Sequence, residues 1–134
     1  MEITLPVFTG LTAATILVLQ LFLMFRVGLA RGRAQLPLGY GDDPDTLRII
    51  RRHANLAENS GLFIAALALL EMLGGAPYAV IGLGAVFVVA RIAHAIGMSA
   101  KETVNPGRVI GALGTVGSGL GIGGYLAYVA ASTL

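Results

Sequence analysis

Long runs of uncharged, apolar residues constrain this chain more than any other feature of its sequence. Residues 4–25 contain no formal charge. At a rise of 1.5 Å per residue, a helix of that length crosses a hydrocarbon core of roughly 30 Å. Only 12% of the 134 residues are charged, whereas a soluble domain carries about 25%. The mean hydropathy of +0.83 agrees, and the sequence therefore predicts an integral membrane protein.

Glycine, proline and charged residues divide the chain into four helical segments. We expect helices near residues 4–30, 46–73, 77–97 and 107–131, with Asp45 or Thr46 as the N-cap of the second and Pro106 near the first turn of the fourth. Only residues 74–76 separate the second and third helices, so these two must be antiparallel. The predicted fold is an all-α, integral membrane four-helix bundle, a single domain over residues 1–134 with four membrane spans.

The distribution of basic residues predicts the orientation of the bundle. Six of the nine Lys and Arg residues lie at residues 26–52 and two lie at residues 101–108, while neither terminus nor the turn at residues 74–76 carries any. By the positive-inside rule, both basic loops are expected in the cytoplasm and both termini on the other side. The start of the chain lacks the basic region of a signal peptide, so we expect the first span to be retained. Because the basic residues cluster at span ends, we expect membrane lipids and no nucleic acid as partners.

The chain has no cysteine. This excludes a disulfide framework, a thiolate metal site and a protein thiol nucleophile. Any sulfur chemistry must therefore use a thiol that a ligand brings.

Glycines concentrate in the fourth predicted helix, which holds eight of the nineteen between Gly107 and Gly124. The four-residue spacings at 117–121 and 119–123 predict a surface for close helix packing, within the chain or between chains. Residues 119–124 also spell GxGxxG. That motif binds dinucleotides only between a strand and a helix N-terminus, so we do not interpret it as a nucleotide site.

A polar stripe opens the second predicted helix. At 100° per residue, Arg51, Asn55 and Glu58 fall within about 60° of one another. A guanidinium, an amide and a carboxylate in this order can hold a zwitterionic ligand, because Arg pairs with carboxylates and Glu accepts from an ammonium group. An ion pair at the membrane surface explains Arg51 and Glu58 equally well. His53 points away from the stripe and is expected to orient a neighbour by a hydrogen bond.

Other ionisable residues lie within or beside the apolar runs, where charges are costly and often functional. Arg91 and His94 end the third helix, where Arg91 could extend to the cytoplasmic interface. Two histidines, His53 and His94, without a third ligand do not favour haem or metal binding, and we expect no metal. Arg108 begins the fourth helix, whose N-terminal dipole adds to its charge and suits an anion. Glu71 is expected to be solvated at the far interface.

These residues resemble the MAPEG family, the membrane-associated proteins in eicosanoid and glutathione metabolism. The most specific element is the pattern Arg-x-His-x-Asn-x-x-Glu, present as Arg51, His53, Asn55 and Glu58. The pair Arg91 and His94, and an arginine at the start of the fourth helix, Arg108, also match. The run at residues 40–42 is similar to the small bacterial members.

The resemblance implies a homotrimer with three glutathione sites between neighbouring subunits, open toward the cytoplasm. Arg51, Asn55 and Glu58 would bind the tripeptide, and Arg31 or Arg33 would reach one of its carboxylates. Arg108 would face the thiol and lower its pKa from about 8.5 toward neutrality. The remaining residues implied for this site are His53, Arg91 and His94. Tyrosines of the animal synthases are replaced here by Met98 and Ala112.

The expected function is that of a membrane-bound glutathione transferase of the MAPEG type, an enzyme that attacks apolar electrophiles arriving from the bilayer. Lipid hydroperoxides are a second expected substrate class, and the inner membrane of a bacterium is the expected location. The alternative is a non-catalytic membrane scaffold or lipid-binding bundle with the same architecture. A transporter is disfavoured because the sequence shows no internal repeat and no broken helices.

Overall fold

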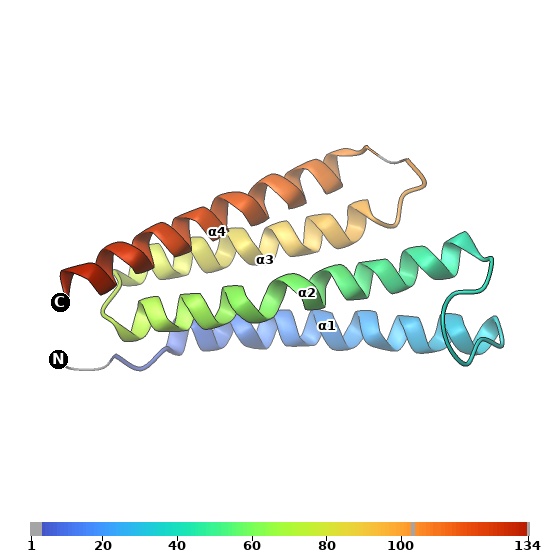
Figure 1. The fold of residues 1–134 in the computed structure, drawn as a ribbon, viewed down its shortest axis with the longest axis horizontal. Helices are drawn as coiled ribbons and strands as arrows, with labels where there is room; N and C mark the ends of the chain where they lie inside the picture. Colours follow the sequence, from blue (N-terminus) through green and yellow to red (C-terminus); the bar gives the residue numbers. More distant parts are fainter. Residues whose placement is uncertain (1–3, 103, 134) are drawn as a thin grey trace.

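The computed structural model describes residues 4–102 and 104–133, and four helices account for most of them. These are α1 (Val7–Arg33), α2 (Pro44–Met72), α3 (Pro77–Gly97) and α4 (Pro106–Ser132). They run alternately up and down, with α1 beside α2 and α3 beside α4 (Figure 1). No strand occurs in the described residues. The predicted all-α four-helix bundle is confirmed.

Both basic loops lie at the same end of the bundle. Figure 1 shows the α1–α2 and α3–α4 connections at one end, and the α2–α3 turn with the two chain termini at the other. At this second end, the Thr4 N–H donates to the Met72 carbonyl at 3.3 Å and holds the start of α1 against the end of α2. The arrangement gives the bundle one basic end.

The N-terminus of α2 differs from the sequence prediction. The prediction of Asp45 or Thr46 as its N-cap was wrong, because α2 begins at Pro44 and the cap is Asp43. The Asp43 carboxylate accepts from the Asp45 and Thr46 N–H groups, both at 3.1 Å, and from the Thr46 hydroxyl at 2.6 Å. Proline suits the first helical position since it has no N–H to leave unpaired.

Three of the four helices are long and apolar enough to cross a membrane by composition. These are α1, α3 and α4, while α2 is less apolar. The N-terminal half of α2 carries Arg48, Arg51, Arg52 and Glu58, which lower its hydropathy. This helix therefore brings a polar face into the membrane-spanning bundle.

Two clusters of buried apolar side chains form the core. One, toward the basic end, includes Leu23, Leu56 and Phe87, and the other includes Leu70 and Ile122. Phe63 packs on both clusters and stacks on Phe87 with ring centroids 4.5 Å apart. Aromatic contact thus joins α2 to α3 at the middle of the bundle.

The α3–α4 contact depends on glycines near the basic end. A Cβ at Gly107 would lie 2.9 Å from the Ala93 carbonyl oxygen, a Cβ at Gly111 would overlap His94, and a Cβ at Gly114 would lie 2.8 Å from Ala90 Cβ. Gly117, one member of the predicted packing pairs, has no such neighbour within 4 Å. In the same predicted pairs, however, a Cβ at Gly119 would lie 2.8 Å from the Phe63 ring and a Cβ at Gly121 would lie 2.6 Å from Leu83. The prediction of close packing by α4 therefore holds within the chain at these two glycines and at the earlier set.

We expect Gly111→Ala to destabilise the bundle by about 1–3 kcal/mol, because the added methyl group forces α4 away from the backbone of α3 at His94. Gly117→Ala is the matched control. Its methyl group meets open space, and alanine favours the helix. Thermal unfolding of both variants in the same detergent checks this, and equal stability of the two would show that the approach of α3 and α4 is not tight.

Candidate functional site

The polar stripe of α2 lies on the outer side of one chain. Arg51 and Glu58 are both about half exposed, with side-chain accessibilities of 52% and 56%. Arg51 Nη1 lies 3.6 Å from Glu58 Oε1, which makes a loose ion pair. A pair this long and exposed contributes little to stability. Both charges are therefore available to a ligand that carries the opposite charges.

Arg91 connects three helices inside the bundle. It is only 3% exposed. Its Nη1 donates to the Thr115 hydroxyl of α4 at 3.0 Å, and its Nη2 donates to Asn55 Oδ1 of α2. The interpretation that this side chain extends to the membrane interface was wrong, because these two acceptors hold the guanidinium in the interior.

The contact with Arg91 fixes the orientation of Asn55. A guanidinium only donates hydrogen bonds, so the oxygen of the Asn55 amide faces Arg91 and the NH₂ group points away from it. Thr115 completes the arrangement and was not foreseen from the sequence. Its hydroxyl accepts from Arg91 and donates to the Gly111 carbonyl at 2.7 Å. Arg91 thus acts on the stripe through Asn55.

Arg108 lies in the first turn of α4, and its position is set by the end of α3. Its backbone N–H donates to Asn105 Oδ1 at 3.1 Å, and its Nε donates to the Gly97 carbonyl at 3.3 Å. Asn105 Nδ2 donates to the same carbonyl at 2.9 Å. The guanidinium is therefore held at the α3–α4 connection, at the basic end of the bundle.

His53 packs toward α1 and not toward the stripe. Its Nε2 lies 2.7 Å from Gln20 Nε2, within hydrogen-bond distance, which agrees with the predicted orienting role. Nδ1 of His94 is buried without a hydrogen-bond partner among the described residues. Across residues 4–102 and 104–133, no group of three or more His, Cys, Asp or Glu side chains could hold a metal ion.

Arg31 and Arg33 end α1 at the basic end of the bundle, and their surroundings differ. Arg31 Nε is buried and has no hydrogen-bond partner among the described residues. Arg33 lines a cavity of about 320 Å³ together with Asp43 and Asp45. Two carboxylates disfavour a further anion there, so Arg31 is the better candidate for binding one.

Glu71 lies outside the stripe and is buried at the opposite end of the bundle. It is 3% exposed, so the expectation of a solvated carboxylate was wrong. One carboxylate oxygen accepts from the Phe8 N–H at 3.0 Å. The other accepts from the Thr9 N–H at 2.8 Å and from the Thr9 hydroxyl at 2.7 Å. Because Pro6 gives α1 no side-chain cap, Glu71 caps that helix from a neighbouring one.

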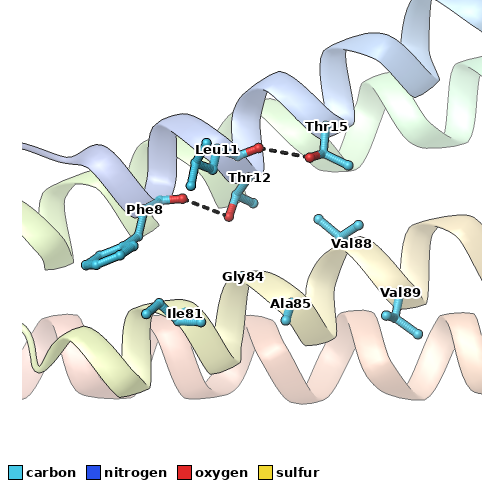
Figure 2. A pocket seen from close by; sticks show the side chains of 9 residues that line it. All are labelled: Phe8, Leu11, Thr12, Thr15, Ile81, Gly84, Ala85, Val88 and Val89. Atoms are coloured by element: carbon cyan, nitrogen blue, oxygen red, sulfur yellow. Dashed lines mark hydrogen bonds between the residues drawn. The ribbon is translucent and has the colours of Figure 1, made fainter.

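The cavities of one chain lie away from the stripe. The cavity in Figure 2, about 360 Å³, lies between α1 and α3. Its two hydroxyls, on Thr12 and Thr15, donate to the Phe8 and Leu11 carbonyls of their own helix (Figure 2), so it offers a ligand mainly apolar surface. Arg51, Asn55, Glu58 and Arg108 line neither this cavity nor the four others described. Of these residues, Arg51 and Glu58 are exposed in a single chain, and Asn55 and Arg108 are half-buried.

Comparison with known families decides the relationship. The sequence model of the MAPEG family matches residues 9–128, which include all of α2 and α3, most of α1 and α4, and every residue of the candidate site. The chain belongs to the MAPEG family. Comparisons with curated proteins and with solved structures give no significant match. MAPEG proteins are membrane helical bundles and include glutathione transferases and related enzymes, so membership agrees with the apolar helices found here.

Proposed function

We propose that this MAPEG protein binds glutathione through the α2 stripe and activates its thiol to attack apolar electrophiles from the bilayer. The observation that carries the proposal is the loose, half-exposed pair of Arg51 and Glu58 beside an amide held by buried Arg91. Glutathione has two carboxylates and one ammonium group, and the stripe offers groups for both signs of charge. When bound, it would supply the thiol that the chain itself lacks.

Each residue of the stripe has a distinct role in this proposal. Arg51 binds a carboxylate, since a guanidinium can donate two parallel hydrogen bonds to it. Glu58 accepts from the ammonium group, and the NH₂ group of Asn55 donates to a second acceptor on the peptide. Arg31 supplies a further cation for a carboxylate. Arg91 is a positioning residue, because it reaches the ligand only through Asn55.

Arg108 is the proposed catalytic residue. Its guanidinium lies at the N-terminus of α4, where the helix dipole adds positive potential. A positive charge beside a thiol favours the thiolate and lowers its pKa from about 8.5. The thiolate is the nucleophile. Lipid hydroperoxides are a second proposed substrate class for the same thiolate.

We further propose that a homotrimer completes the site. Arg51 and Glu58 are exposed in one chain, and the stripe and Arg108 line none of the cavities described. A second copy packed on α2 would enclose the stripe and exclude water, which strengthens its electrostatic interactions. The basic end would face the cytoplasm of a bacterium and the termini the opposite side of its inner membrane.

Thermal unfolding with glutathione tests the proposal. A ligand that binds only the folded state stabilises it by RT ln(1 + [L]/Kd), about 2.7 kcal/mol at a hundredfold excess over Kd. We expect millimolar glutathione to stabilise the purified protein and the Glu58→Gln variant to lose most of this gain. Glu102→Gln, an exposed change at the same end of the bundle, should retain it. No stabilisation of the unaltered protein would contradict the proposal and favour a non-catalytic scaffold.

A further inference from the structure

A second group of basic residues lies apart from the stripe, between α1 and α2. Arg26 is the first charge after the uncharged residues 4–25, seven residues before the end of α1. Arg52 lies eight residues after the start of α2. At 1.5 Å per residue, both lie roughly 10–12 Å inside their helix ends. Because α1 and α2 are antiparallel and in contact (Figure 1), the two residues lie at a similar distance from the basic end of the bundle, at the edge of the apolar run.

Neither side chain of this pair has a counter-charge within the part of the chain that the structure describes. The described residues place no carboxylate within ion-pair distance of Arg26 or Arg52, although Arg48 and Arg51 on the same helix each have one. Nε of Arg52 is buried and has no hydrogen-bond partner among the described residues. The charges of Arg26 and Arg52 also repel each other. An anion between two guanidiniums of like charge relieves their mutual repulsion and offers the buried Nε of Arg52 an acceptor.

We infer that Arg26 and Arg52 form a binding site for the phosphate of an anionic phospholipid headgroup. Arginine matches phosphate geometry with parallel N–H donors. Lipid phosphates lie at the boundary of the hydrocarbon region. Arg26 and Arg52 are expected at the same boundary, because the uncharged residues 4–25 end there. The inference does not depend on glutathione binding, since neither residue belongs to the stripe.

The test compares lipids of different headgroup charge. The protein is reconstituted in mixed micelles of detergent and phosphatidylcholine. Its thermal stability is then followed as phosphatidylglycerol replaces part of the phosphatidylcholine. We expect phosphatidylglycerol to stabilise the unaltered protein. The double variant Arg26→Gln/Arg52→Gln should lose most of this gain, because it lacks both guanidiniums that would hold the phosphate. The control Arg48→Gln/Lys101→Gln removes the same charge from the same end and should respond like the unaltered protein.

Three results would overturn the inference. The first is an equal response of the double variant and the control. The second is an equal gain from inorganic phosphate in phosphatidylcholine, which would assign the site to free phosphate. The third is a change in the oligomeric state of the double variant in phosphatidylcholine alone. This result would indicate that the two arginines pair with a carboxylate of a neighbouring copy. If the double variant does not fold, Arg26→Gln alone tests the inference, because this exposed side chain can be removed without disturbing the core.

Discussion

Replacement of Glu71 by glutamine is expected to destabilise the bundle by about 3 kcal/mol or more. The buried carboxylate accepts three hydrogen bonds from the first turn of α1, at 2.7–3.0 Å. A glutamine has only one acceptor atom, so its NH₂ group would face a backbone N–H and leave that donor unpaired. Unpaired buried donors cost about 1–3 kcal/mol each in proteins and several kcal/mol in lipid. Glu71→Ala, which removes both acceptors, should be at least as destabilising.

Thermal or denaturant unfolding in one detergent measures this effect. Glu102→Gln removes the same charge from an exposed loop position and should change stability by less than about 0.5 kcal/mol. We also expect Glu71→Gln to loosen the N-terminus of α1 selectively, seen as faster amide exchange at Phe8 and Thr9. Unfolding of Glu71→Gln at the same point as Glu102→Gln would contradict the capping role.

The architecture could be predicted from the sequence because membrane helices leave strong local signals. The positions of proline and glycine and the clustered arginines are sufficient to predict four antiparallel helices with one basic end, as the structure has them (Figure 1). The N-cap of α2 was misplaced by two or three residues because Asp43, Asp45 and Thr46 are all suitable caps. Only Asp43 precedes Pro44, a residue that favours the first helical position.

The contacts of buried polar residues could not be predicted in the same way. The partners of Arg91 are Asn55 and Thr115, which lie 36 and 24 residues away in the sequence. No spacing rule connects residues on three helices. The burial of Glu71 had one usable signal, since Pro6 leaves the first turn of α1 without a side-chain cap. A lone carboxylate in an apolar run is then a candidate acceptor.

The second large expected effect is the loss of the glutathione thiolate in Arg108→Leu. Free glutathione is only a few per cent thiolate at neutral pH. In the proposed site the guanidinium of Arg108 stabilises the anion, so bound glutathione should be largely thiolate. Leucine fills a similar volume without charge. The variant loses the hydrogen bond from Arg108 Nε to the Gly97 carbonyl, but Asn105 still donates to that oxygen, and we expect the fold to persist.

The ultraviolet difference spectrum of glutathione with the purified protein at neutral pH tests the central claim most directly. We predict a thiolate absorbance that saturates as glutathione is added. The signal should persist in Lys101→Leu, which removes a positive charge from the same α3–α4 connection. It should be absent in Arg108→Leu, at glutathione concentrations that still stabilise that variant. A thiolate signal of equal size in Arg108→Leu, or none in the unaltered protein when glutathione is bound, would contradict the account.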